Sequence, residues 1–342
     1  MAKLIDFRSD TVTRPSDHMR SLMMAAAVGD DVYGDDPSTN DLQEFAADLL
    51  GHEASLFLPT GTQSNLVALL THCQRGDEYI VGTDAHTYKY EGGGAAALGG
   101  IQPQTLDFGD NGELDLAKVK NLIKEDDFHF ARTRLLCLEN TQHGRVQSLD
   151  YLKSAQQFAK EQGLQIHLDG ARMANAAVAL GVDLKSIGGC FDTVSLCLSK
   201  GLGAPIGSLL LGSKLFIDEA RRWRKVTGGG MRQVGMLAAA GKMALTAGFE
   251  RMHLDHENAS YLAAQLEGMP GVTVKEGWTQ TNMVWLEFEE SCGEVLSAEA
   301  RAANVLVSAY GQSCRIVTHH DVDKADIDRL VLLLKTFFQK AS

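Results

Sequence analysis

The chain lacks the features of a membrane protein or a nucleic-acid-binding protein. Its 342 residues contain no uninterrupted apolar stretch that approaches the roughly 20 residues of a membrane helix. The net charge is −12, from 32 basic and 44 acidic residues, which argues against a nucleic-acid partner and leaves no basic stripe for a membrane surface. The first ten residues place charges where a secretion signal needs an apolar core, so we expect a protein that is not secreted.

Cysteine pairs with the spacing of a redox or metal site are also missing. None of the six cysteines forms a C-x-x-C pair, and Cys137 and Cys197 lie inside apolar strand-like runs, where buried reduced thiols are expected. This scatter predicts a reducing cytoplasm rather than a disulfide framework. The pairs His253-x-x-His256 and His319-His320 have no matching carboxylate or cysteine pattern, so we expect no metal.

Strand-like and helical segments alternate over the first two-thirds of the chain. Residues 38–50 form a helical pattern that Ser38-Thr39-Asn40 can cap and Gly51 can stop, and residues 149–162 form another. The alternation predicts an α/β fold with a mostly parallel sheet flanked by helices. The expected strands are 54–58, 78–82, 134–138, 165–169, 194–199 and 206–211.

The pattern changes toward the C-terminus. Residues 231–266 predict one long helix or two consecutive helices, after which short strands are expected at 282–288, 305–307 and 316–318. An amphipathic helix follows at 324–338. We therefore expect a large domain of residues 1–250 that includes the N-terminal segment, and a smaller C-terminal α+β domain of residues 251–342.

Two charged residues end strand-like segments that should be buried. Asp169 ends the run from Leu164, and Lys200 ends the run from Val194. Parallel sheets bind ligands at the carboxyl ends of their strands, so both side chains should face one crevice. Together they can hold pyridoxal 5′-phosphate (PLP), the lysine through a Schiff base and the aspartate at the pyridinium nitrogen.

Two other strand ends supply groups that such a site needs. Backbone N–H groups near Gly61 and the hydroxyl of Thr62 open a helix after a strand and can bind a phosphate, although a plain strand–helix turn explains the dipeptide alone. His86 follows the strand 78–82, where an imidazole could stack on PLP and hold a proton near a substrate. A single loop histidine is more often solvated. Three independent strand ends, however, supply His86, Asp169 and Lys200, and this favours the functional interpretation.

Arginines are the candidates for binding a substrate carboxylate, because their planar fork matches it and a lysine does not. Arg172 lies three residues after Asp169, and Arg315 begins the late strand-like segment 315–319. A surface salt bridge is the ordinary role of an arginine, but Arg315 heads an apolar strand. The basic cluster 221–225 fits a solvated helix face or a phosphate contact that reaches a neighbouring subunit.

Several segments match the motifs of one known family. Residues 6–13 resemble its D-L-R-S-D-T-V-T signature, and residues 28–37 match its V-G-D-D-V-Y-G-D-D-P. On these motifs the chain resembles the L-threonine aldolases, particularly the bacterial low-specificity type, within the fold-type I PLP enzymes related to aspartate aminotransferase. The resemblance runs from about residue 4 to the C-terminus, and further matches are 168–172, 199–203, 228–233 and 315–319.

The resemblance implies a fold-type I PLP-dependent transferase architecture and a role for each matching residue. Lys200 would hold PLP, Asp169 would pair with its ring nitrogen, and His86 would stack on the ring. Family members are usually homotetramers built from dimers, so the active sites should lie at a subunit interface. The remaining roles would be phosphate binding by Gly61 and Thr62, cofactor contacts of Arg172 and of the partner's Lys225 and Arg232, substrate-carboxylate binding by Ser9, Arg172 and Arg315, a β-hydroxyl contact of His129, and a pocket contribution from the partner's Tyr33.

The resemblance implies retro-aldol cleavage of L-threonine, L-allo-threonine and other L-β-hydroxy-α-amino acids to glycine and an aldehyde. The base for the β-hydroxyl proton stays open between His86, His129 and a water that they hold. Departures from the family pattern at Phe7, 142–145 and 173–174 leave the substrate preference open. The alternatives are a β-eliminating lyase, racemase or aminotransferase on the same fold, or a catalytically silent PLP-binding module.

Overall fold

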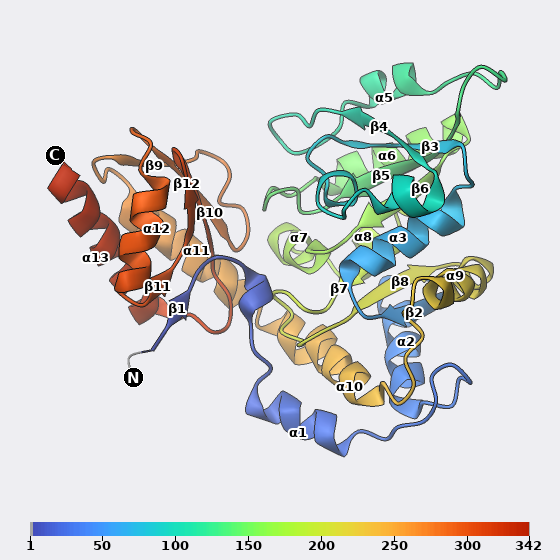
Figure 1. Cartoon of the computed structure of the whole chain (residues 1–342), viewed down its shortest axis with the longest axis horizontal. Helices are drawn as coiled ribbons and strands as arrows, with labels where there is room; N and C mark the ends of the chain where they lie inside the picture. Colours follow the sequence, from blue (N-terminus) through green and yellow to red (C-terminus); the bar gives the residue numbers. More distant parts are fainter. Residues whose placement is uncertain (1–2, 342) are drawn as a thin grey trace.

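The computed structural model describes residues 3–341, and its larger part contains a seven-stranded sheet (Figure 1). The strands lie in the order β2-β8-β7-β6-β5-β3-β4, and all run in one direction except β8, which is antiparallel to both neighbours. The expected mostly parallel sheet is confirmed. Its strands are β2 (Ala54–Leu58), β3 (Asp77–Gly82), β4 (Gln102–Leu106), β5 (Arg132–Glu139), β6 (Gln165–Asp169), β7 (Thr193–Cys197) and β8 (Ser208–Gly212).

Helices cover both faces of this sheet (Figure 1). Along β2, Leu56 and Leu58 lie in an apolar cluster with residues of α3 and α9, whereas Phe57 lies in a second cluster with residues of α2, α6 and α8. Because both faces are buried, the strands read as nearly continuous apolar runs. The covering helices are α2 (Pro37–Leu50), α3 (Gly61–His72), α6 (Leu149–Gln162), α7 (Met173–Leu180), α8 (Leu184–Gly188), α9 (Lys214–Val226) and α10 (Gly235–Met243).

Local sequence sets both ends of α2. Asp36 caps the helix by accepting a hydrogen bond from the Thr39 N–H at 2.9 Å, and Pro37 occupies the first helical position, where its missing N–H is not needed. Gly51 ends the helix with a left-handed φ of 74°, as expected. The expected cap at residues 38–40 is wrong, because the aspartate before the proline takes that role.

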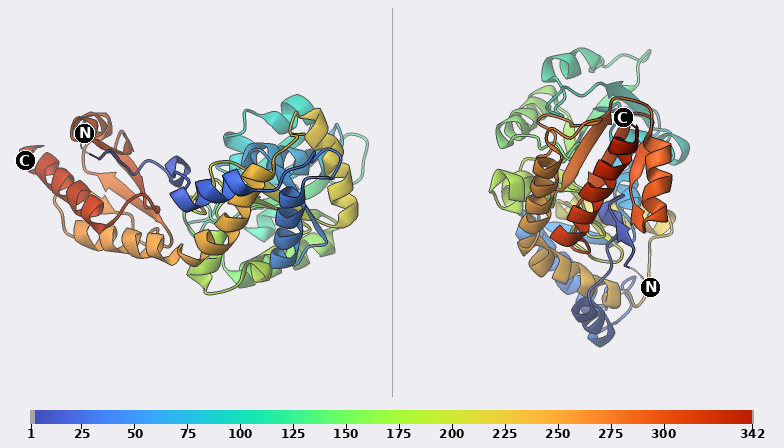
Figure 2. Two further views of the ribbon diagram at one scale, coloured as in Figure 1. Left: turned by 90° about the horizontal axis from the view of Figure 1, so that it is seen from below. Right: turned by 90° about the vertical axis from the view of Figure 1, so that its left-hand side faces the viewer.

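The C-terminal residues form a second hydrophobic core around a four-stranded antiparallel sheet (Figure 2). The N-terminal residues also belong to this core. The strand β1 (Ile5–Asp6) pairs in parallel with β11 (Val305–Leu306), and Phe7 packs in the same core. The expectation that the N-terminal segment belongs with residues up to 250 is therefore wrong for these residues. The other elements are β9 (Val272–Val274), β10 (Met283–Phe288), β12 (Ser308–Tyr310), β13 (Ser313–Val317), α11 (His253–Leu266), α12 (Gly293–Ala302) and α13 (Lys324–Ala341).

The segment expected to form one or two helices after residue 231 is interrupted. Helix α10 continues into the turn η3 (Ala244–Gly248), and α11 starts after a break. Between residues 3 and 341, no helix combines the length and the apolar character that crossing a membrane requires. The remaining short elements are η1 (Asp10–Val12), α1 (Asp17–Ala25), α4 (His86–Lys89), η2 (Ala95–Gly99) and α5 (Leu116–Leu122).

Candidate functional site

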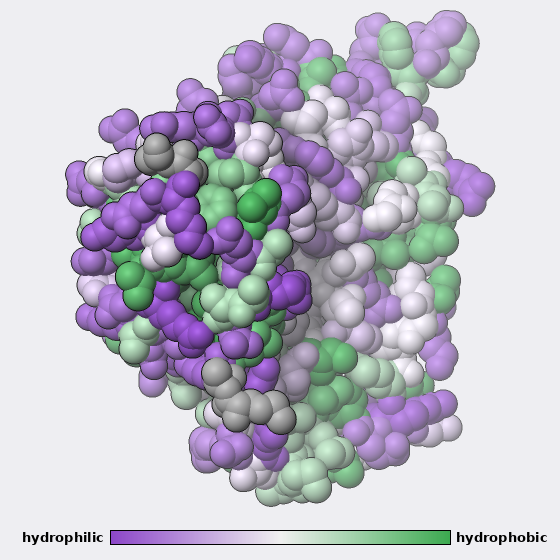
Figure 3. Space-filling model, turned by 60° about the vertical axis from the view of Figure 1, so that its left-hand side comes forward, coloured by the Kyte–Doolittle hydropathy of each residue, from purple (hydrophilic) through white to green (hydrophobic). Residues whose placement is uncertain are grey.

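The carboxyl ends of β3, β5, β6 and β7 meet at one edge of the large sheet. Glu139, the last residue of β5, lies opposite Asp169, the last residue of β6, and Asp169 lies opposite Ser195 of β7. His86 begins α4, four residues after β3 ends. In the space-filling view, the surface is hollowed between the C-terminal part and the larger part of the molecule (Figure 3).

Lys200 lies just beyond β7, in a turn that two hydrogen bonds fix. Its carbonyl accepts from the Gly203 N–H at 2.8 Å and from the Thr13 hydroxyl at 3.2 Å. Its ammonium group makes no hydrogen bond or ion pair within residues 3–341. An amine without a partner at the end of a buried strand is placed to react with a ligand carbonyl.

Asp169 is 2% exposed and is held by two donors. One carboxylate oxygen accepts from the Ala171 N–H at 3.0 Å, and the other accepts from the side-chain amide of Asn65 at 2.8 Å. These donors satisfy a buried carboxylate without neutralising its charge. The aspartate can therefore stabilise a cationic ring nitrogen.

His86 is tied to two glutamates. Its backbone N–H donates to Glu139 at 2.7 Å, and its ring Nδ1 lies 2.8 Å from a carboxylate oxygen of Glu91. The hydrogen bond with Glu91 raises the pKa of His86, against the effect of burial. Burial and the neighbouring Asp169 raise the pKa of Glu91. The histidine–carboxylate pair fixes the orientation of the imidazole.

The ligand atoms of His86, Glu91 and Asp169 all lie within 4.8 Å of one another, a spacing that could hold a metal ion. The Asn65 amide, however, donates to both carboxylates, at 2.8 Å in each case, and the third group is bonded to Glu91. A cation would meet this amide nitrogen between the two carboxylates. The group therefore suits a hydrogen-bonded network around a cofactor.

Arg172 is held by a residue that sequence reasoning missed. Its Nε donates to Asp10 at 2.9 Å and its Nη2 to the other oxygen at 2.5 Å, while Asp10 is fully buried. Burial alone would raise the pKa of Asp10, but the Arg172 guanidinium lowers it well below the usual range. Ser9 precedes this aspartate and caps η1 by accepting from the Thr11 N–H. Two of the five Arg172 N–H donors are therefore engaged by Asp10, and those of Nη1, with the second N–H of Nη2, are left for a substrate.

Arg315 faces the same region from β13. Its Nη2 donates to the Arg8 carbonyl at 3.2 Å, but its buried Nε has no partner within the described chain. Burial and the positive charge of Arg172 both lower the pKa of Arg315. Two guanidinium groups beside the single carboxylate of Asp10 leave one positive charge in excess. An anionic ligand carboxylate would supply both the missing acceptor and the missing charge.

The first turn of α3 offers free backbone donors. Thr60 caps the helix by accepting from the Gln63 N–H, which leaves the N–H groups of Gly61 and Thr62 without helical acceptors. A Cβ at Gly61 would meet only Cys197, at 3.9 Å, so the approach to this backbone is open. These donors, with Lys200 and Asp169 at neighbouring strand ends, fit the phosphate, aldehyde and ring nitrogen of PLP.

Tyr33, Lys225 and Arg232 form a separate exposed group. Arg232 donates to Asp30 at 2.9 Å and lies 6.0 Å from the ring centre of Tyr33, which is 78% exposed. No hydrogen bond, ion pair or ring contact joins these residues to Lys200 or His86 in the described chain. Within one chain, the structure does not bring these residues into the site.

His129 lies outside the site of its own chain. It precedes β5, whereas Glu139 ends β5 beside Asp169, so His129 belongs to the opposite edge of the sheet. At roughly 3.3 Å per residue, the length of β5 alone is on the order of 23 Å. The imidazole is exposed and bonded to Asp127 at 2.6 Å. Within a single chain His129 therefore does not reach the candidate site, and a contact with the substrate from a neighbouring subunit stays a prediction.

Sequence reasoning missed Asp10, Asn65, Glu91 and Glu139 as members of the site. The strand-end rule could have found Glu139, because it ends β5 as Asp169 ends β6. Burial, together with the charge of Asp169, raises the pKa of Glu139 to about 7. Asn65 and Glu91 lie on a helix and a loop, and no local sequence signal distinguishes them.

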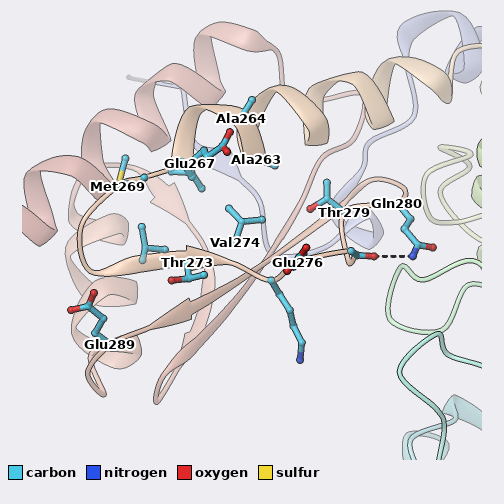
Figure 4. A pocket seen from close by; sticks show the side chains of 15 residues that line it. Ala263, Ala264, Glu267, Met269, Thr273, Val274, Glu276, Thr279, Gln280 and Glu289 are labelled. Atoms are coloured by element: carbon cyan, nitrogen blue, oxygen red, sulfur yellow. Dashed lines mark hydrogen bonds between the residues drawn. The ribbon is translucent and has the colours of Figure 1, made fainter.

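A cavity of about 820 Å³ lies elsewhere, beside α11 and β9 of the C-terminal part (Figure 4). Its polar lining consists mainly of Glu267, Glu276, Glu289 and Lys275, and it contains no histidine, cysteine or arginine. The chemistry-bearing side chains lie instead at the edge of the large sheet, so we place the candidate site there.

Comparisons with known proteins show which proteins the chain is similar to. The model of the beta-eliminating lyase family matches residues 6–289. The low specificity L-threonine aldolase of Escherichia coli is 52% identical over 337 residues, which cover 98% of this chain and 100% of that protein. The low-specificity L-threonine aldolase 1 of Arabidopsis thaliana is 41% identical, over 94% of this chain and 93% of that one. A solved threonine aldolase of Leishmania major superposes with a TM-score of 0.83 at 22% sequence identity. The match covers 98% of this chain and 99% of that one, and it confirms the fold.

Proposed function

The chain belongs to the beta-eliminating lyase family, and from this premise we propose that it cleaves L-threonine and L-allo-threonine to glycine and acetaldehyde, with PLP as cofactor. Other L-β-hydroxy-α-amino acids would give glycine and the corresponding aldehyde. The observation that carries the proposal is the meeting of an unpartnered amine, a buried carboxylate and an imidazole at one sheet edge: Lys200, Asp169 and His86.

The residues of this edge divide the binding of the cofactor among them. Lys200 would hold PLP covalently, Asp169 would bind its ring nitrogen, and His86 would lie over its ring. Gly61 and Thr62 would donate to its phosphate from the start of α3. When bound, PLP supplies an electron sink for the bond that breaks at Cα.

Arg315 and Arg172 would orient the substrate through its carboxylate. The unpartnered Nε of Arg315 and the remaining N–H groups of Arg172 would donate to it, and the Ser9 hydroxyl lies 3.5 Å from Asp10, the partner of Arg172. A carboxylate held at one end would fix the orientation of the substrate, and so would decide which bond at Cα gives its electrons to the sink that PLP supplies. The arginines would therefore select the Cα–Cβ bond by orientation.

His86 is the better candidate for the base that takes the β-hydroxyl proton. Its Nδ1 is engaged by Glu91, so Nε2 is the nitrogen that can accept a proton from a substrate. His129 cannot serve within the same chain, because it lies at the opposite sheet edge. A water held by His86 would perform the same task.

We also propose a cytoplasmic homotetramer, a dimer of dimers with active sites at subunit interfaces. Exposed apolar side chains support it, since Met24 of α1, Tyr33 of the following loop and Val226 at the end of α9 are each more than two-thirds exposed. Tyr33, Lys225 and Arg232 would contact the cofactor of a neighbouring subunit. His129 would reach a substrate only from another subunit.

The proposal is tested by a visible absorbance scan of the purified protein with PLP, followed by product analysis. L-threonine and L-allo-threonine should each release acetaldehyde and glycine. Lys200→Ala should remove both the absorbance of lysine-bound PLP and the turnover, whereas Lys160→Ala, at an exposed lysine of α6, should change neither. Release of 2-oxobutyrate would instead identify a β-eliminating lyase, and formation of D-threonine a racemase. A yellow protein without any product would be a silent binding module.

A further inference from the structure

A buried chain of hydrogen bonds leads away from the candidate site into the large sheet. Asn65 of α3 donates to Asp169 and Glu91 through its amide nitrogen, and its oxygen lies 3.2 Å from Nε2 of His167 on β6. Nδ1 of His167 lies 2.8 Å from the Thr193 hydroxyl of β7, which lies 2.7 Å from Nε2 of His72. These residues do not contact a substrate, and the reaction as proposed above does not use His72, His167 or Thr193.

Counting the available protons assigns the donor and the acceptor of every hydrogen bond in this series. Two carboxylates face the Asn65 nitrogen, so the amide must point its N–H groups at them and its oxygen at His167. His167 therefore carries its proton on Nε2, and its Nδ1 accepts from the Thr193 hydroxyl. That hydroxyl has then given its one proton, so it accepts from the Nε2–H of His72.

Both histidines of the chain are neutral at ordinary pH, which the counting requires. Burial lowers the pKa of His167 to about 4, against the charge of Asp169. Burial and the neighbouring His167 lower the pKa of His72 to about 3. Each ring thus has one N–H and one acceptor nitrogen, and each position is assigned by its neighbour.

We propose that Asn65 is a positioning residue for the reaction. Its side-chain amide links Asp169 to the Glu91–His86 pair, and the His72–Thr193–His167 series of hydrogen bonds fixes the orientation of that amide. The role in the reaction rests on the proposed function. The hydrogen-bond chain itself does not, because it consists of protein groups alone.

The consequence concerns the imidazole of His86. With the Asn65 amide between them, Asp169 and Glu91 can both stay ionised at close range, and Glu91 accepts the Nδ1–H of His86. Without the amide, burial and repulsion favour a proton on Glu91. A protonated Glu91 donates to Nδ1 instead, so the ring proton moves to Nε2. His86 then has no free nitrogen to accept the β-hydroxyl proton.

The first test is Asn65→Leu, which keeps the shape of the side chain and removes the donors. In the holoenzyme, the acid limb of the kcat–pH profile should move to higher pH by about one unit or more, because a hydrogen bond to a charged group is lost. The value of kcat should fall up to about tenfold for each unit of that shift on the acid side of the profile, and recover at higher pH as Glu91 ionises. An unshifted profile would refute the role of Asn65.

A second readout needs no cofactor. In ¹⁵N-histidine NMR spectra of the unloaded protein above the pKa of His86, the ring of His86 should be protonated at Nδ1 and that of His167 at Nε2. Thr193→Val removes the hydroxyl that fixes His167, so the His167 signals should change tautomer or broaden, with a smaller shift of the pH profile in the same direction. A His167 ring protonated at Nδ1 in the unmodified protein would overturn the assignment, even if Asn65→Leu does not fold.

Ser195→Ala is the matched control. It also removes a buried hydroxyl from β7, but that hydroxyl donates to Ser64 and takes no part in the His72–Thr193–His167 series of hydrogen bonds. It should change neither the histidine signals nor the pH profile, and an equal shift would mean that any buried hydroxyl of β7 has this effect. If the unmodified enzyme releases no aldehyde, the proposed function fails. The NMR result still decides whether the series of hydrogen bonds from Asn65 to His72 has the proposed arrangement.

Discussion

Replacing Arg315 with lysine tests how the substrate carboxylate is held. The buried Nε of Arg315 has no partner in the described chain, whereas its Nη2 already donates to a backbone carbonyl. Lysine keeps the positive charge but offers one ammonium group in place of a planar fork. The variant therefore loses about one charged hydrogen bond to the substrate, worth roughly 1.5–3 kcal/mol, which corresponds to about a 10-fold to 150-fold fall in kcat/KM.

The assay is aldehyde release from L-threonine over a range of concentrations, with the affinity for glycine measured by absorbance as a binding readout. We expect KM and the dissociation constant of glycine to rise together, because both ligands carry the same carboxylate. Arg329→Lys is the control, since this arginine of α13 also donates to a backbone carbonyl but lies outside the site. The reasoning is refuted if kcat/KM of Arg315→Lys stays within about threefold of the unmodified enzyme, a difference well below one hydrogen bond to a charged group.

Three further predictions concern charged groups. Asp10→Asn should lower the urea midpoint, because it leaves the partly buried Arg172 without its charged partner; the cost should be at most about 3–5 kcal/mol. Because the pKa of Asp10 is lowered, the difference in stability from the unmodified protein should persist above pH 3.8 and shrink as the pH falls below it. The pKa of Glu139 is raised by burial from 4.5 to about 7, so the unmodified protein should lose stability as the pH rises through that window. The Glu139→Gln variant should not lose stability over this pH range. Parallel plots of urea midpoint against pH for the variant and the unmodified protein would contradict this prediction. His129→Ala should reduce activity only in the assembled oligomer, as measured by turnover across a dilution series, and an equal effect on a monomeric fraction would contradict its position.

The large sheet could be predicted from sequence because its strands are buried on both faces. Strands 54–58 and 165–169 were placed correctly to the residue, since apolar runs bounded by turn residues have little freedom. The edge strand β4 was missed, because Gln102–Leu106 is half-exposed and contains a proline. The reversed direction of β8 could not be predicted, since strand direction depends on which neighbour it joins.

The site was predictable where it depends on strand ends and not where it depends on helix packing. Asp169, Lys200 and His86 follow buried strands, so their common edge follows from the parallel sheet. Asn65 enters through the packing of α3 on the sheet, and Arg172 finds its partner Asp10 162 residues earlier in the chain. The role of His129 stays a prediction, because a family motif does not say which chain supplies the residue to a given site.

The N-terminal segment has a consequence for the order in which the enzyme is made. Ile5 pairs with Val305, and the carbonyl of Arg8 accepts from Arg315, so residues 5–8 reach their partners only after about 300 further residues have been synthesised. The large sheet can form while the chain is still growing, since all its strands precede residue 213. Arg172 and Arg315, the arginines proposed to bind the substrate carboxylate, come together only after β13 is complete. A growing chain would therefore complete the edge of the large sheet that carries Asp169 and Lys200 before Arg172 and Arg315 can meet.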